Sequence, residues 1–239
     1  MPQGRGGRLW ERIWIGLLHL VPLRLYTVII RGIAAIPVPR RLRRKVLGVL
    51  ARWVGMDLRE AELPLAEYRS FAELFVRRLR AGARPVAGDG LAVCPVDGCV
   101  VSCGRAEAGE LVQAKNIHYR LDELLVDRAL AQRVDGGSYV TIYLRPRDYH
   151  RIHCPAEAQV VATQHVRGRL FAVQPAMVRN VMGLFVRTER LVIWLESDLG
   201  TIALVCVGAA AVGSIGTVFV APRGGRRYDP PVSVGRGAE

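Results

Sequence analysis

Two histidines, His150 and His153, lie three positions apart in the segment RPRDYHRIHCP, residues 145–155. Histidine is the side chain whose ordinary pKa lets it give and accept protons near neutral pH. The segment follows an apolar run at 138–144 that is typical of a strand, so we expect both imidazoles at a strand end. Proton transfer and metal ligation both suit this arrangement. The spacing leaves both open, together with the alternative of two surface histidines beside arginines.

A metal site would need further ligands close to these histidines. Cys154 and Asp148 are the nearest candidates, but no third ligand follows at a familiar metal-binding spacing. We therefore predict no metal ligands, and keep a metal-dependent hydrolase that uses His150, His153 and Asp97 as a rival hypothesis. The five cysteines include no C-x-x-C pair, which argues against a disulfide framework and favours a reducing compartment.

Two further segments are candidates for function. In CPVDG, residues 94–98, Asp97 lies between an apolar run and a glycine that permits a tight turn. Alone, this pattern is a common turn. The run VGAAAVGSIGTV at 207–218 consists largely of small residues that allow a close backbone approach, or simply a tightly packed strand.

The elements that must position these residues change character along the chain. Apolar residues at helical spacing predict a helix over 65–82, which ends at Gly82 before Pro85. After Pro85, short Val/Ile/Leu runs separated by Gly and Pro predict a body rich in sheet, with one helix at Leu121–Gln132. Strands are expected at 91–93, 99–103, 138–144, 157–163, 191–196 and 201–207. The predicted fold class is α+β, with N-terminal amphipathic helices before a mainly antiparallel, sheet-rich body.

The N-terminal region, residues 1–60, is expected to associate with membranes, and 61–239 to form the catalytic body. From Trp10 to Ile36 the chain is largely apolar and long enough to cross a bilayer, but Pro22, Arg24 and Arg31 interrupt it. An arginine at the centre of a spanning helix costs about 2.5–3.5 kcal/mol. A helix that lies in the membrane interface is therefore favoured over one that crosses it.

Charge along this region supports the same prediction. Arg24, Thr27 and Arg31 would form one polar stripe opposite apolar residues. The cluster RRLRRK at 40–45 adds about 1 kcal/mol of attraction per basic side chain to an anionic leaflet. The alternative is a helical hairpin packed on the body, with its arginines solvated.

The overall charge implies acidic partners. The 239 residues are 51% hydrophobic and carry a net charge of +13, nearly all of it from arginine because lysine occurs only at positions 45 and 115. Anionic lipid and nucleic acid both meet this electrostatic demand. The sequence has no recognised nucleic-acid-binding motif or aromatic stacking platform, so we predict no nucleic-acid partner.

Seven segments, taken in order from about residue 60 onward, resemble the phosphatidylserine decarboxylase family of pyruvoyl-dependent enzymes, prokaryotic type. They are SFAELFVRRLRAGARPV at 70–86, PVDG at 95–98, QAKNIHYRLDELL at 113–125, YLRPRDYHRIHCP at 143–155, GRLFAVQP at 168–175, VRTERL at 186–191 and VGAAAVGSIGTV at 207–218. Of these, RPRDYHRIHCP is the most specific. The resemblance implies a phosphatidylserine-decarboxylase-like fold.

The resemblance also implies an activity and its residues. Phosphatidylserine would be converted to phosphatidylethanolamine and carbon dioxide through a Schiff base on a self-generated pyruvoyl group, because decarboxylation needs an electron sink that side chains do not supply. Asp97 would orient His153, the base that activates a serine for pyruvoyl formation. His150 would transfer the proton in decarboxylation, and Tyr143 would line the substrate site. The arginines at 145, 147 and 151 are phosphate-binding candidates, or solvated residues.

In the family, the processing serine belongs to a G-S-T segment after a G-x-E-M-G-x-F stretch. This sequence ends at Gly237-Ala238-Glu239, which matches the start of that stretch, so we expect the pyruvoyl serine beyond Glu239. Ser214 matches an upstream V-G-S-I element and is not assigned this role. The chain is then a truncated proenzyme or the larger β chain.

The same resemblance names partners and a location. The expected partners are the small pyruvoyl-bearing α chain, phosphatidylserine and an anionic phospholipid membrane, at the cytoplasmic face of the bacterial inner membrane, and a homodimer is compatible with it. The rival from a different class is a catalytically inactive, lipid-binding homologue, which the missing serine would favour.

Overall fold

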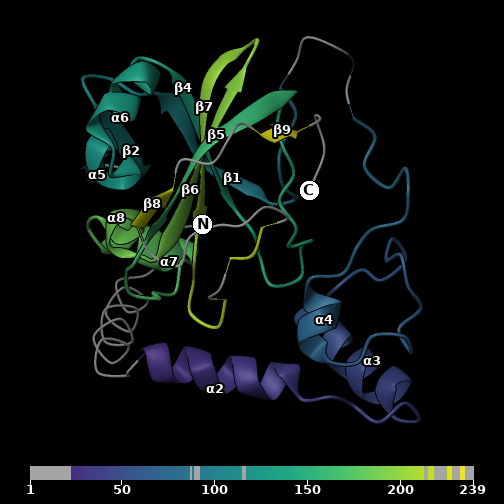
Figure 1. Ribbon diagram of the computed structural model, residues 1–239. Coiled ribbons are helices and arrows are strands. Elements are labelled where there is room, and N and C mark those ends of the chain that lie inside the picture. Colours follow the sequence, from purple (N-terminus) through teal and green to yellow (C-terminus); the bar gives the residue numbers. More distant parts are fainter. Residues whose placement is uncertain are drawn as a thin grey trace, which may run out of the picture.

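The computed structural model describes residues 23–86, 88, 92–114, 117–212, 215–217, 225–227 and 232–234. The N-terminal helices lie on one side of the molecule, and antiparallel strands together with further short helices form the rest, as Figure 1 shows. The predicted α+β class is therefore confirmed. The part of the predicted interfacial segment before residue 23, Ser214, and the last five residues lie outside the described residues.

Among the described residues, the helices on the N-terminal side are α2 (Leu23–Ala35), α3 (Arg43–Val54) and α4 (Phe71–Phe75). In Figure 1, α2 runs along the base of the molecule, with α3 and α4 beyond its C-terminal end. A small core joins α3 and α4 and includes Leu47, Tyr68 and Leu74. Within the described ranges, none of the helices combines the length and the apolar character that crossing a membrane requires.

The main sheet has the strand order β7-β6-β5-β8, and all its pairs are antiparallel. Its strands are β5 (Ala158–Val166), β6 (Arg190–Ser197), β7 (Gly200–Val207), β8 (Gly225–Arg227) and β9 (Val232–Val234), which also pairs with β5. The central strand β6 is buried over its first six residues because side chains pack on both of its faces. Helices α7 (Pro175–Asn180) and α8 (Leu184–Arg187) contribute to the larger of the two cores.

Two further ladders complete the body. Strand β1 (Cys99–Arg105) pairs with β4 (Ser138–Tyr143), and β2 (Glu110–Ala114) pairs with β3 (Ile117–Arg120). The predicted strands at 99–103, 138–144, 157–163, 191–196 and 201–207 correspond to β1, β4, β5, β6 and β7. The described part of the predicted strand at 91–93 is irregular, and β2 and β3 were not predicted.

The predicted helix over 65–82 is wrong except for α4. The Ser70 side chain accepts a hydrogen bond from the Glu73 amide, and the Glu73 carboxylate accepts one from the Arg69 amide, so side-chain caps start the helix at Phe71. After α4 the chain becomes extended, because the Arg80 amide bonds to the carbonyl of Glu60. Capping and pairing with a distant segment therefore outweigh the helical spacing.

The predicted helix at Leu121–Gln132 is instead two short helices, α5 (Leu121–Leu125) and α6 (Arg128–Val134). Val126 between them has a φ of 56°, a left-handed conformation that ends α5. The Asp127 carboxylate then accepts a hydrogen bond from the Leu130 amide and caps α6. The shared apolar side is real, since Leu121, Leu124 and Leu125 are all buried.

Candidate active site

The segment RPRDYHRIHCP leaves the end of β4 as a loop that is held by its own side chains. Asp148 accepts hydrogen bonds from the Arg145 amide at 2.8 Å and from Arg145 Nε at 2.9 Å. Arg147 Nε lies 3.9 Å from the same carboxylate. These contacts close a turn that directs Tyr149 and His150 toward the interior.

His150 is fixed on both its edge and its face. Its Nδ1 lies 2.9 Å from the carbonyl oxygen of Asp148, and since a carbonyl only accepts, Nδ1 carries the proton. Its ring packs on Phe75 of α4, with 4.0 Å between the centroids. Burial lowers the pKa of His150, and the charge of Arg77 lowers it further, while Asp148 offsets part of the shift. The neutral ring then has its lone pair on Nε2.

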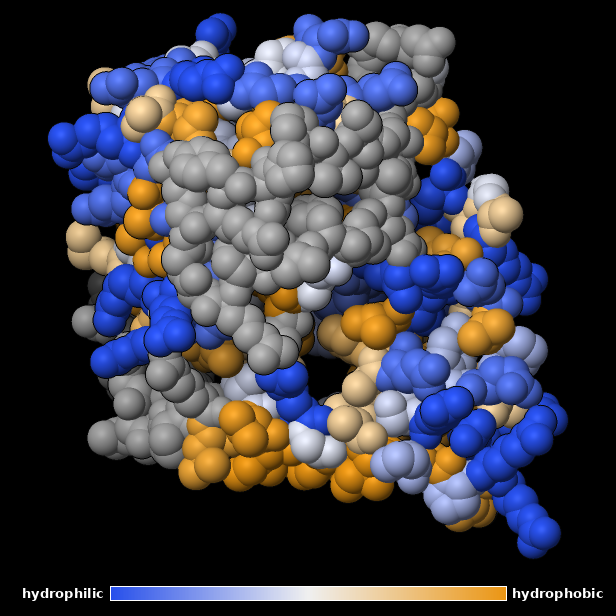
Figure 2. Space-filling view, viewed as in Figure 1, coloured by the Kyte–Doolittle hydropathy of each residue, from blue (hydrophilic) through white to orange (hydrophobic). Residues whose placement is uncertain are grey.

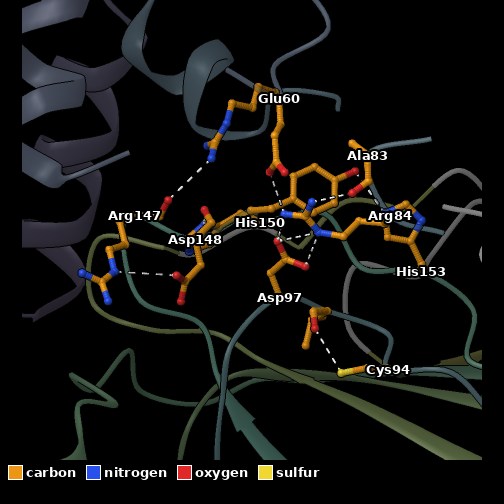
Figure 3. Close-up of polar contacts among 12 residues, drawn as sticks. Glu60, Ala83, Arg84, Cys94, Asp97, Arg147, Asp148, His150 and His153 are labelled. Carbon is orange, nitrogen blue, oxygen red and sulfur yellow. Dashed lines mark hydrogen bonds and ion pairs between the residues drawn. The ribbon is translucent and has the colours of Figure 1, made fainter. Parts of the chain in front are cut away.

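His153 joins the loop to the PVDG turn. Its backbone amide donates to the carbonyl of Pro95 at 2.8 Å. The Nε2 atom of its ring lies 3.0 Å from the hydroxyl of Tyr149, and the two rings are stacked. The turn that carries Asp97 and the loop that carries both histidines are thus adjacent, as Figure 3 shows.

Gly98 explains how that turn fits against β4. A Cβ atom at this position would lie 2.6 Å from the Ile142 side chain and 2.8 Å from the Tyr143 carbonyl oxygen. Only glycine therefore lets the backbone after Asp97 pack on the end of the strand that feeds the loop. Tyr143 itself is partly buried, and burial raises the pKa of its hydroxyl.

The carboxylate of Asp97 faces Arg84, as Figure 3 shows. Arg84 Nε donates to both carboxylate oxygens at 3.0 and 3.1 Å, and Nη2 donates to one of them at 2.6 Å. Nη2 also donates to Glu60 at 2.9 Å, and Nη1 to the Ala83 carbonyl at 2.7 Å. We call this set the Glu60–Arg84–Asp97 link. It raises the pKa of Arg84 and lowers that of Glu60.

The structure thus brings Asp97, His150, His153 and Tyr143 to one end of the β1–β4 ladder. The direct pairing of Asp97 with His153 stays a prediction, because the hydrogen bonds described above join Asp97 to Arg84 and His153 to Tyr149. Within the described part of the chain, no three His, Cys, Asp or Glu residues form a group that could hold a metal ion.

Sequence reasoning missed the supporting residues Arg84, Glu60, Tyr149, Phe75 and Arg77. Arg84 and Phe75 belong to the segment at 70–86, which carries the resemblance but has no spacing relation to the histidines. Tyr149 lies in the loop directly before His150. Its hydroxyl, close in sequence to two imidazoles, was the feature from which a supporting role could have been predicted.

Comparison with known proteins decides the family. The family model for phosphatidylserine decarboxylase matches residues 71–239. The chain belongs to the phosphatidylserine decarboxylase family. The match begins at α4, so it takes in Arg84, Asp97 and both histidines of the loop. The resemblance inferred from the seven segments is confirmed.

Similar proteins from bacteria carry the same family name. A phosphatidylserine decarboxylase proenzyme of Anaeromyxobacter sp. (strain K) is 42% identical over 241 residues, covering 96% of this chain and 85% of the relative. The proenzyme of Acidovorax ebreus is 41% identical, covering 92% of this chain and 80% of the relative. That of Myxococcus xanthus is 37% identical, covering 87% and 75%. The similarity to these proenzymes therefore covers most of the chain.

Proposed function

We propose that this protein is a phosphatidylserine decarboxylase that releases carbon dioxide from phosphatidylserine and leaves phosphatidylethanolamine. The observation that carries the proposal is the convergence of Asp97, His150 and His153, from two motifs of the family, at one end of the β1–β4 ladder. Nothing in the geometry favours the metal-dependent hydrolase.

The reaction needs an electron sink, which we propose is a pyruvoyl group formed from a serine beyond Glu239 and carried by the α chain. When present, this carbonyl group accepts the electron pair left by the departing carboxylate. The site suits such a small polar group, because Nε2 of the His150 imidazole takes part in none of the hydrogen bonds described here and can reach a polar atom placed beside it. His150 would be the residue that faces it.

In this proposal, His150 supplies the proton that replaces the lost carboxylate. Its Nδ1 is occupied by the Asp148 carbonyl, so Nε2 is the atom that gains and releases this proton. A lowered pKa makes the imidazolium form a stronger acid, which favours donation to carbon. Such acid catalysis typically contributes about 10²–10⁴-fold in rate.

Asp97 and His153 would act earlier, in the formation of the pyruvoyl group. His153 Nε2 is bonded to the hydroxyl of Tyr149, so this nitrogen is already able to bind a hydroxyl group. A serine hydroxyl at that nitrogen would lose its proton to His153. Arg84 pairs with Asp97 and fixes the orientation of its side chain, which suits a carboxylate that must hold an imidazole.

The N-terminal region, residues 1–60, would hold the protein on an anionic membrane, which we place at the cytoplasmic face of the bacterial inner membrane. On α2, Thr27 is only 1% exposed, and its hydroxyl accepts a hydrogen bond from the Ala211 amide. Thr27 of the predicted polar stripe thus faces the body.

The side chains of α2 that are exposed to solvent form an apolar surface. The exposed residues of α2 and its end include Leu25, Tyr26, Val28, Ile29, Ile33 and Ile36. Figure 2 shows hydrophobic residues along the base of the molecule, where α2 lies. On α3 and its N-cap, Leu42, Val46, Val49 and the 85% exposed Trp53 form a second exposed apolar set beside the basic cluster at 40–45. We call these two sets the apolar base, and its exposure supports attachment to lipid.

The decisive experiment measures carbon dioxide released from carboxyl-labelled phosphatidylserine by the proenzyme that extends through the processing serine. We expect release by the wild type and a loss of at least 100-fold in His150→Ala, with vesicle binding unchanged. If the cleaved wild type binds phosphatidylserine vesicles but releases no label, the inactive lipid-binding homologue is correct and the decarboxylase proposal is wrong.

A further inference from the structure

Arg77 is a buried cation that the roles proposed for Asp97 and the two histidines do not use. Its residue is 4% exposed. Nη2 donates one long hydrogen bond, 3.5 Å, to the Arg147 carbonyl. Nε and Nη1 are buried and have no hydrogen-bond partner in the part of the chain that the structure describes. An unpaired buried polar group costs about 1–3 kcal/mol, and a charged one more.

The acidic groups around Arg77 already pair with other arginines. Asp57 and Asp97 both act on its charge through space. The Asp57 carboxylate, however, accepts hydrogen bonds from Arg59, the shortest at 2.6 Å. Asp97 is held by Arg84 at the same distance. The Arg77 guanidinium is therefore left with donors for one further anion, while burial lowers its pKa.

More positive charge surrounds this position. Arg151 Nε donates to the carbonyl of Val76, the residue before Arg77, at 2.8 Å. Arg147 packs beside Gly55 at the end of α3, where a Cβ would lie 3.8 Å from its Cδ. The side chain of Arg147 is half exposed. A buried guanidinium with more accessible ones around it can attract an anion from solvent and hold it inside.

We propose that Arg77 is the inner end of an anion site that binds a phosphate group, with Arg147 and Arg151 at its outer side. In the decarboxylase reaction, the occupant is the phosphodiester of the lipid headgroup. The planar fork of a guanidinium matches phosphate oxygens. An ion pair to the reacting carboxylate would instead stabilise the substrate more than the transition state, in which charge leaves that carboxylate. The identity of this occupant rests on the proposed function.

Phosphate binding does not require the pyruvoyl group, so the chain of 239 residues can be tested directly. Thermal unfolding is followed in inorganic phosphate and in glycerophosphoserine, with chloride keeping the ionic strength constant. The wild-type midpoint should rise with the logarithm of ligand concentration. In Arg77→Met, the apparent affinity should fall by about 10- to 100-fold. Its midpoint in chloride should stay equal or rise, because an unpaired buried charge is removed.

The matched control is Arg78→Met, the same change at the exposed neighbour, which should keep the wild-type affinity. A wild type that does not respond to either ligand, or an Arg77→Met variant with unchanged affinity, overturns the proposal. If Arg77→Met does not fold, Arg77→Lys decides, since it keeps the charge but loses the fork. Weaker phosphate binding by Arg77→Lys supports the site, and unchanged binding overturns it.

A second readout locates the bound anion. Arg77 and Asp148 are the charged groups that act on His150. Phosphate bound at Arg77 would offset its charge and raise the pKa of His150, which an NMR titration of the imidazole measures. The rise should occur in Arg78→Met and be absent in Arg77→Met. Phosphate binding without this rise places the anion elsewhere and overturns the assignment to Arg77.

The two ligands separate a headgroup site from a general phosphate site. Glycerophosphoserine should act at lower concentration than inorganic phosphate, and equal affinity would overturn the headgroup assignment. Both ligands can bind whether or not the protein decarboxylates phosphatidylserine, so a negative decarboxylation assay does not affect the outcome of the binding experiment. The two proposals can therefore fail independently.

Discussion

At the scale of single residues, the site depends on how each imidazole is held. His150 has Nδ1 on a backbone carbonyl and its face on Phe75, whereas His153 has Nε2 on a tyrosine hydroxyl. The first arrangement fixes which nitrogen can exchange a proton, and burial lowers the pKa of that ring. The two imidazoles are thus held by different partners although they lie three residues apart.

The lowered pKa of His150 predicts how activity depends on pH. If the imidazolium donates the proton, turnover should fall as pH rises through a pKa below 6.5. Phe75→Leu removes the stacked ring and admits water, so it should move both the NMR-measured pKa and the falling limb of kcat toward higher pH. Phe71→Leu, on the same helix, is the control. A limb that stays in place while the pKa moves would remove His150 from this role.

Arg84 makes a second prediction at this scale. Arg84→Lys keeps the charge but loses the fork that holds Asp97, so self-cleavage of the proenzyme should slow by about 10- to 100-fold. Cleavage is followed by the appearance of the small chain on a gel. Arg80→Lys, an exposed arginine that donates to the Ala61 carbonyl, should cleave at the wild-type rate. Equal rates for both variants would mean that Arg84 does not position Asp97.

At the scale of elements, buried polar side chains join the short helices to the sheets. Gln113 of β2 donates to the Val178 and Val181 carbonyls and accepts from the Leu184 amide, which fixes α7 and α8. Arg190 at the start of β6 is 1% exposed and donates to carbonyls at the ends of α5 and α8. Burial lowers its pKa to about 10. The helices are too short to be stable alone, so these bonds help to keep them in place.

Arg190→Met should therefore lower the free energy of unfolding by about 3–5 kcal/mol, since several buried carbonyls lose their donor. Urea denaturation measures this change. The same substitution at Arg77 serves as the contrast, because two nitrogens of that guanidinium have no hydrogen-bond partner among the described residues. If both variants lose a similar free energy of unfolding, the number of hydrogen bonds made by each guanidinium does not determine how much these buried arginines stabilise the fold.

The sequence predicted the body better than the connections. The strands β1 and β4 to β7 are rich in branched residues at regular intervals, so local pattern identified them. Asp97 pairs with Arg84, which lies 13 residues earlier in an irregular segment. Arg84 also pairs with Glu60, which is 24 residues from Arg84. Such contacts depend on how the turn packs at Gly98, which no local spacing encodes. For the same reason, the sequence pattern of α2 indicated an amphipathic helix but did not indicate that Thr27 would point toward the body.

At the scale of the whole molecule, the apolar base lies on the helical side, apart from the main sheet (Figure 1, Figure 2). The basic cluster at 40–45 spans the turn before α3 and the first residues of that helix. A membrane that contacts this base would meet both lipid-soluble side chains and positive charge.

Ile29→Glu with Ile33→Glu should therefore reduce binding to vesicles of anionic phospholipid by at least 10-fold, with little change in stability because both side chains are exposed. Vesicle flotation measures the bound fraction, which should also decrease with salt. Val140→Glu adds one carboxylate at an exposed position of β4 and should bind like the wild type. If the α2 variant floats with the vesicles as well as Val140→Glu does, the base is not the membrane contact.

The Glu60–Arg84–Asp97 link also limits how far the protein can be shortened at its N-terminus to obtain a soluble form. Removing α2 takes away much of the apolar base and leaves the link complete. A cut after residue 60 would also remove α3, whose Leu47 packs in one core with Leu74 of α4, the helix that supports His150 through Phe75. A trimmed enzyme that begins near residue 37 should keep its site, whereas one that begins near residue 62 should lose the supports of Asp97 and His150 together.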